Sequence, residues 1–262
     1  MSSLEMVNTT STMTTYEKWA IALSIIAILI PVVQFIWKTF IQQPKLNYYT
    51  TGSAHLFCNK SGSYIQVEGV FESLKQAVSV KNVSIEIVRD SDNKSMCLSW
   101  SVFVSPINQR FMGVFASANE SAHPFRIEAN QISCAFIEFS DSAQASTTTI
   151  EPEYNRLIRF SSNLRSRYNI CEDAISELKQ SDEYSIAKKA IENELFWKAD
   201  SYKAIVSAQY GKKTKSFPLT FDVSEQECTR IHQNIEELLL VPIKECYGLK
   251  WQMQPVTIRV KQ

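Results

Sequence analysis

Apolar and polar residues divide the chain into one uninterrupted apolar stretch, a region of alternating residues and a region of helical spacing. The apolar stretch covers residues 19–37, nineteen consecutive positions without a charge. At about 1.5 Å per residue, a helix of this length spans roughly 28 Å, close to the thickness of a bilayer core. Trp19 and Trp37 mark its two ends, and tryptophan favours the headgroup level. We therefore predict a transmembrane anchor at residues 17–40, after a short tail at residues 1–16.

Two other interpretations compete with an anchor. A cleaved signal peptide has a basic segment before its apolar stretch and a small-residue cleavage site after it. The first sixteen residues contain neither Lys nor Arg, and residues 38–44 contain no A-x-A pattern. A core helix normally keeps a polar face, which residues 19–37 lack. The anchor is therefore favoured, with a kink expected at Pro31, as membrane helices tolerate.

Flanking charges predict the orientation of this anchor. Lys18 precedes the stretch, whereas Lys38 and Lys45 follow it. The positive-inside rule then places the short tail outside and the large domain in the cytoplasm, with the protein in the plasma (inner) membrane as a single-pass protein. The six cysteines are widely spaced, which fits reduced thiols in that compartment, although six can also form three disulfides outside the cell.

Alternating residues predict antiparallel strands between Pro44 and Asp141. The alternation is seen at residues 65–71, 83–88, 98–105 and 134–139, with turn-rich breaks at 59–62 and 90–94. Short strands with regular breaks and no helices between them are typical of a β-sandwich. Trp100 is the candidate for the core tryptophan of an immunoglobulin-like sandwich.

Helical spacing follows a polar run at residues 142–149. Residues 153–198 are predicted to form helices, and strand character returns at 202–206 and 217–223 around a hairpin turn at 211–213. Ser224 and Glu227 form a capping-box signature, which predicts a helix that begins there and ends near Pro242. Residues 256–260 alternate as a closing strand.

The predicted fold class is therefore β-rich α+β. A single N-terminal transmembrane helix precedes a soluble immunoglobulin-like β-sandwich at residues 44–262, which contains a helical insertion at about 151–199 and a C-terminal helix. The alternative is two domains divided in the polar run, a sandwich and a C-terminal α+β unit.

Composition narrows the class of function. The chain has 262 residues with 27 basic and 27 acidic side chains, and 45% of its residues are hydrophobic. A disordered chain needs low hydrophobicity and high net charge, so that class is excluded. A bulk nucleic-acid binder needs an overall positive charge, which is absent.

Catalytic and cofactor motifs are not evident in the sequence. The three histidines, His55, His123 and His232, have no Cys or carboxylate nearby at metal-ligand spacing. There is no C-x-x-C pair, nucleophile elbow, P-loop or dinucleotide fingerprint. We expect no metal, no cofactor and no catalytic residue, and an enzyme is not favoured, although distant residues can still assemble a nucleophile triad.

Two basic clusters are candidates for binding. Arg156, Arg159 and Arg167 fall in one stripe of the predicted helix, while Arg165 points elsewhere. A row of guanidinium groups can hold phosphate groups of a ligand, but it is also the ordinary solvated flank of an amphipathic helix paired with carboxylates such as Glu153. The second cluster, at the predicted hairpin tip, contains Lys212, Lys213 and Lys215, a pattern that often protects a sheet edge.

These features predict a membrane-anchored protein-interaction module with a protein partner. A second hypothesis is a ligand-gated membrane sensor or effector that binds a phosphorylated small molecule through the arginine stripe and forms homo-oligomers through the anchor, where Pro31 and Gln34 would contribute. A third, a membrane-tethered hydrolase, predicts a concave pocket that holds a histidine or paired carboxylates.

Overall fold

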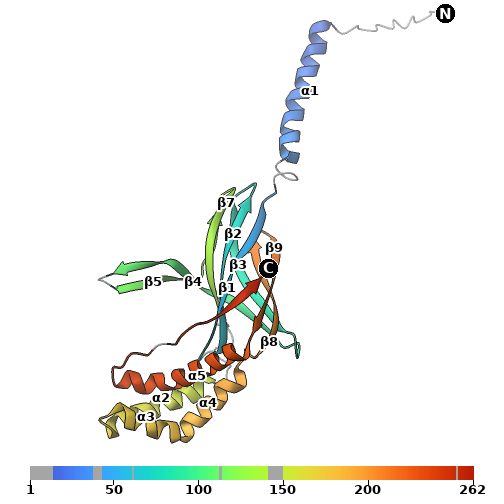
Figure 1. Cartoon of the computed structure of the whole chain (residues 1–262). Helices are drawn as coiled ribbons and strands as arrows, with labels where there is room; N and C mark the ends of the chain where they lie inside the picture. Colours follow the sequence, from blue (N-terminus) through green and yellow to red (C-terminus); the bar gives the residue numbers. More distant parts are fainter. Residues whose placement is uncertain (1–13, 38–42, 61, 112–113, 141–149, 252) are drawn as a thin grey trace, which may run out of the picture. The chain divides into compact units, whose positions relative to one another are not determined.

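The computed structural model describes residues 14–37, 43–60, 62–111, 114–140, 150–251 and 253–262 (Figure 1). By packing, the chain divides into two compact units, Met1–Pro44 and Lys45–Gln262.

The first unit contains the apolar helix α1, Thr15–Ile36. A capping box begins it: the Glu17 N–H donates to Thr14 Oγ1 at 3.3 Å, and the Thr14 N–H donates to Glu17 Oε2 at 2.8 Å. Pro31 lies inside the helix, and none of its residues is buried. The helix is long and apolar enough to cross a membrane, which fits either an anchor or a signal sequence.

The second unit is built on one antiparallel sheet, whose strands in the described residues are β1 (Lys45–Asn59), β2 (Gly62–Leu74), β3 (Val78–Arg89), β4 (Ser95–Phe111), β5 (Val114–Ser121), β6 (Phe125–Ile127), β7 (Gln131–Ser140), β8 (Asp200–Tyr210), β9 (Lys213–Val223) and β10 (Val256–Lys261). Their order is β5-β4-β7-β2-β1-β10-β9-β8-β3-β6. A further pairing of β3 with β4, from Ser84↔Ser99 to Val88↔Ser95, closes eight of the strands into a ring. Closure leaves few free edges, and the hairpin β4–β5 extends away from the ring (Figure 1).

The predicted β-rich class with one N-terminal apolar helix is confirmed, but the immunoglobulin-like arrangement is not. An immunoglobulin domain packs two separate sheets face to face, whereas every strand here belongs to one continuous sheet. The core tryptophan also differs from the prediction. Trp100 is only half-buried, beside Phe103 and Phe125, whereas Trp197 is 1% exposed.

Alternation places the core inside the ring. Along β2, every second residue from Ser63 to Ser73 is buried, as the period-2 pattern predicts. Gly69 is one of them, and a Cβ at this position would lie 2.5 Å from two ring carbons of Tyr48. The strand therefore needs glycine there because a buried aromatic ring lies against its backbone.

In the part of the chain that the structure describes, four helices cover one end of this sheet (Figure 1): α2 (Ile150–Arg167), α3 (Cys171–Gln180), α4 (Asp182–Glu194) and α5 (Glu225–Cys246). The capping box predicted at Ser224 and Glu227 is confirmed. The predicted end near Pro242 is wrong, because α5 continues through Pro242 to Cys246. Val241, Pro242 and Ile243 are all buried, so the packing of this turn offsets the hydrogen bond that proline removes.

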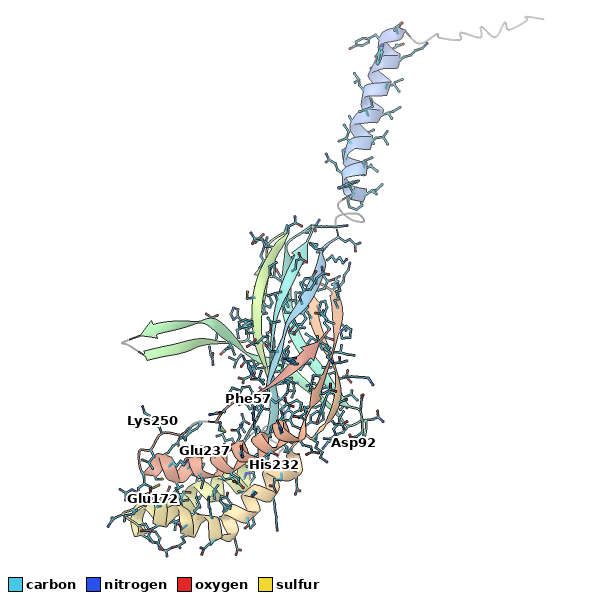
Figure 2. The ribbon with its side chains drawn as sticks, in the orientation of Figure 1. Phe57, Asp92, Glu172, His232, Glu237 and Lys250 are labelled. Carbon is cyan, nitrogen blue, oxygen red and sulfur yellow. The ribbon has the colours of Figure 1, made fainter. Side chains whose placement is uncertain are left out.

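A short connector between α4 and β8 ties the helices to the sheet. The Trp197 Nε1–H donates to the Phe57 carbonyl at 3.0 Å, and the Phe196 N–H donates to Ser63 Oγ at 3.0 Å. Phe57 and Asp92 both lie near the end of the strands that adjoins the helices (Figure 2). We call this the helix end of the sheet, and the opposite end, where β1 begins at Lys45, the entry end.

Candidate functional site

An apolar groove of about 630 Å³ lies at the helix end, between α2, α5 and the chain after α5. Its apolar lining comes from Tyr154 and Ile158 of α2, from Leu238, Val241 and Pro242 of α5, and from Trp251 and Met253. The α2 pair is spaced i, i+4 and the α5 positions i, i+3 and i+4, so each helix presents one stripe to the groove. We use "apolar groove" for this feature throughout.

The floor of the apolar groove is fixed by hydrogen bonds. The Tyr154 hydroxyl donates to the Leu238 carbonyl at 3.0 Å. Burial, and then the negative charge of Glu245, raise the pKa of Tyr154 to about 12, so the phenol stays neutral. At the edge, the Trp251 Nε1–H donates to Glu245 Oε1 at 3.0 Å. The groove is therefore apolar inside, with the exposed carboxylate of Glu245 and the ammonium of Lys60 beside it.

Large apolar side chains at this groove remain in contact with water. Ile158 is 38% exposed and Trp251 40% exposed. The volume lies within the range of small-molecule sites, but the groove is a surface feature that joins exposed apolar groups, which is typical of a protein-binding surface.

The arginine stripe is largely paired on its own surface. Arg156 Nη1 lies 3.1 Å from Glu153 Oε2, and Arg167 Nη1 lies 2.8 Å from Glu177 Oε1. Arg159 is exposed on the same helix. Two of the three predicted ligand-binding arginines thus have carboxylate partners, as on a solvated helix flank. Their role in phosphate binding stays a prediction.

Arg165 does point elsewhere. Its guanidinium lies over the ring of Tyr247, 4.5 Å from the centroid, and donates to the Tyr168 carbonyl at 3.4 Å. The Tyr247 hydroxyl donates to the same carbonyl at 2.7 Å. Arg165 therefore joins the end of α2 to the end of α5.

A chain of hydroxyl, imidazole and carboxylate lies on the outer face of the sheet. His55 Nδ1 is 2.9 Å from Thr257 Oγ1, and His55 Nε2 is 3.2 Å from Glu68 Oε1. The Ser53 hydroxyl donates to Glu68 Oε2 at 2.8 Å. The register places His55 directly opposite Thr257, just after an irregularity of β1 in which Gly52 adopts a positive φ of 91°. Such bulges re-aim side chains and are common beside active sites.

One placement of the protons on these hydrogen-bonded side chains suits proton transfer. With the proton on Nε2, His55 donates to Glu68, and Nδ1 can accept the proton of the Thr257 hydroxyl. Thr257, Ser53 and Arg259 line a groove of about 670 Å³. Asp222 and Glu227 line it as well. This hydrogen-bonded set could not be predicted from the sequence, because Thr257 is 202 residues away from His55.

The other two histidines have ordinary surface partners. His123 Nδ1 lies 3.0 Å from the Ser121 carbonyl, and His232 lies 4.0 Å from a carboxylate oxygen of Glu192 with 53% of its side chain exposed. Across the described ranges, no group of three His, Cys, Asp or Glu side chains is placed to hold a metal ion.

Comparison with known proteins identifies no family for this chain. No protein-family model matches the chain, and no curated protein matches it. Among solved structures, a family 123 glycoside hydrolase from Clostridium perfringens, studied for glycolipid glycan hydrolysis, aligns with a TM-score of 0.30 at 10% identity, over 69% of this chain and 27% of that one. A likeness this weak indicates neither a common fold nor a common function.

Proposed function

We propose that the protein is a single-pass membrane protein whose second unit is a protein-interaction module. The observation that carries the proposal is the apolar groove, in which Ile158 and Trp251 keep large apolar surfaces exposed. Exposed apolar surface beside a polar rim is where a protein partner gains the most from burial.

The membrane part of the proposal rests on α1. Every residue of Thr15–Ile36 lacks burial within the protein, so a bilayer is the environment that would cover these side chains. Under the proposal, residues 17–40 stay attached as the anchor. The proposal also puts the second unit in the cytoplasm, at the plasma (inner) membrane, because the positive-inside rule favours the side that carries Lys38 and Lys45.

The chemistry of the groove defines the partner. Its apolar lining suits two or three apolar side chains of a partner segment, and Glu245 at its edge suits a neighbouring lysine or arginine. The proposed partner is therefore a protein with an exposed apolar segment that carries a basic residue.

Photo-crosslinking in native membranes tests this function. With a photoreactive amino acid at position 158 of the full chain, we expect one discrete adduct. The matched control is position 205, since Ile205 is 41% exposed on β8 and Ile158 is 38% exposed on α2. Glu245→Lys should reduce the adduct about tenfold, because a like charge then faces the partner's basic residue. Glu245→Gln should have a smaller effect, because the amide oxygen can still accept from Trp251.

Two results would contradict the interaction module. One is the same adduct at positions 158 and 205, which indicates unspecific collisions. The other is an adduct at 158 that Glu245→Lys leaves unchanged.

A membrane-tethered hydrolase is a second candidate, supported by the chain Thr257–His55–Glu68. In it, His55 would act as general base, Thr257 as nucleophile and Arg259 as the positive group beside the developing oxyanion.

If this candidate is right, a fluorophosphonate probe should attach to Thr257 of the full chain. His55→Gln should slow the labelling by about 100-fold or more. Intact-mass measurement of the wild type and of Thr257→Val decides: no adduct, or the same adduct in both, rules this candidate out.

A further inference from the structure

Six lysines gather at the entry end of the sheet, opposite the helices. Cross-strand register places them there. Lys45 pairs with Leu74, next to Lys75, while Lys213 pairs with Tyr210 across the hairpin tip that holds Lys212. Tyr210 in turn pairs with Val80, next to Lys81. With Lys215, these side chains form what we call the basic rim: Lys45, Lys75, Lys81, Lys212, Lys213 and Lys215.

Lys215 joins the two sides of the basic rim. Its Nζ donates to the Leu46 carbonyl at 2.6 Å and to Asn47 Oδ1 at 3.2 Å, and it lies 5.3 Å from the centroid of the Phe217 ring. Burial, and then the positive charge of Lys45, lower the pKa of Lys215. The two hydrogen bonds bring the hairpin β8–β9 next to the start of β1, so the like charges of Lys215 and Lys45 lie near each other.

In the described strands and turns next to the basic rim, Glu72 and Glu128 carry negative charge, and both have hydrogen-bond or ion-pair partners. Glu72 accepts from the Asn47 amide at 3.2 Å and from the Tyr49 hydroxyl at 3.0 Å. Glu128 is paired with Arg126 at 2.8 Å, so that pair is neutral. Among the described residues named here, the entry end therefore carries more basic than acidic side chains, which the zero net charge of the whole chain conceals.

The helix end carries net charge of the opposite sign. Within their bounds, the helices α2 to α5 contain nine basic and fourteen acidic side chains. The second unit is thus positive at one end and negative at the other, and its charge separation favours one orientation next to an anionic surface.

We infer that the basic rim binds the headgroups of anionic phospholipids. Lysine ammonium groups next to an anionic leaflet are attracted to it without a shaped pocket. The peptide that follows α1 enters the second unit at Lys45, within the basic rim itself. Tyr49, 46% exposed, and Ile132, 64% exposed, lie on strands next to the rim and can enter the interfacial layer. This surface is distinct from the apolar groove, which stays open to a partner at the other end.

Lysine labelling of the full chain in nanodiscs tests this inference. Discs contain either phosphatidylcholine alone or phosphatidylcholine with about 30% phosphatidylserine. An amine-reactive reagent and peptide mass spectrometry then give a labelling rate for each lysine. We expect Lys75, Lys212 and Lys213 to react about fivefold more slowly in the anionic discs. The exposed lysines Lys198 and Lys250, away from the rim, should react at the same rate in both.

Salt and charge reversal supply the controls. At about 1 M salt the Debye length falls to about 3 Å, so the protection should disappear. Lys212→Glu with Lys213→Glu should abolish the protection of Lys75, because the pair reverses the sign of the exposed hairpin tip. Lys198→Glu with Lys250→Glu should leave it intact. The thermal midpoint of each variant shows whether it is folded.

Several outcomes would overturn the inference. Equal rim labelling in both kinds of disc is one, and equal protection of Lys198 and Lys250 is another. Protection that appears only when duplex DNA is added to the neutral discs would assign the rim to nucleic acid instead. None of these outcomes affects the crosslink at position 158, so the two proposals fail independently.

Discussion

Replacing Arg89 with methionine is expected to lower the free energy of unfolding by about 3 kcal/mol. Arg89 is 2% exposed, and its guanidinium makes three hydrogen bonds: Nε and Nη2 donate to the two carboxylate oxygens of Asp92 at 3.0 and 2.6 Å, and Nη1 donates to the Phe196 carbonyl at 2.6 Å. Methionine keeps much of the volume but leaves the Phe196 carbonyl without this donor, and an unsatisfied buried acceptor is costly.

Urea unfolding of the full chain in detergent micelles, followed by tryptophan fluorescence, measures this effect. The matched control is Arg126→Met, because the side chain of Arg126 is 65% exposed and its pair with Glu128 is a surface ion pair. That variant should change stability by less than about 1 kcal/mol. An Arg89→Met protein as stable as the control would contradict the role of Arg89 in holding the connector.

The same contact predicts a dependence on pH. The hydrogen bond from Arg89 holds the pKa of Asp92 well below its usual range. A carboxyl whose pKa is lower in the folded state contributes stability above its unfolded pKa of about 3.9 and loses it as the pH falls further. Stability of the wild type should therefore decline below about pH 4, and Arg89→Met should decline less steeply over the same range.

Introducing lysine at Ile26 and Leu29 is expected to remove the protein from the membrane. Both residues lie near the middle of α1, on one face and about half exposed. Each lysine at the centre of a membrane helix costs about 3 kcal/mol, so two together disfavour insertion by several orders of magnitude. Membrane fractionation after expression of the full chain measures the loss.

The control for this prediction keeps the side chains apolar. Ile26→Leu with Leu29→Ile exchanges the two residue types and should fractionate with the membrane like the wild type. Retention of the double-lysine variant in the membrane fraction would show that α1 does not hold the protein there.

Local features of the fold were predictable because they depend on neighbouring residues. The alternation of residues 83–88 predicts a strand, and β3 contains it. The pair Ser224 and Glu227 predicts the start of α5, since both partners of a capping box lie within one turn. Likewise, the uncharged run at 19–37 predicts the apolar helix from its own composition.

Long-range features were not predictable, because alternation does not say which strands pair. The closure of the ring depends on β4 pairing with both β3 and β7. The choice of Trp197 rather than Trp100 as the buried tryptophan depends on the connector reaching the Phe57 carbonyl.

The candidate sites also combine local features that were predictable with long-range contacts that were not. The basic cluster at the hairpin tip was visible in the sequence. Its neighbour Lys45 is at least 167 positions away, and the two come together because Lys215 reaches the Leu46 carbonyl and Asn47. The apolar groove was missed because Ile158 and Trp251 belong to segments that meet only after the helices pack. The spacing of apolar residues such as Leu238 indicates the buried face of a helix, but it does not indicate a groove.

The claim that α1 is a retained anchor underlies the proposed function and decides where the second unit works. The most direct test is intact-mass measurement of the wild-type chain in membranes washed with alkaline carbonate. If α1 is a retained anchor, the full-length chain, 29.9 kDa, stays in the washed membranes. A chain shortened by the first 37 to 44 residues and recovered in the soluble fraction would contradict it, because α1 would then be a cleaved signal sequence.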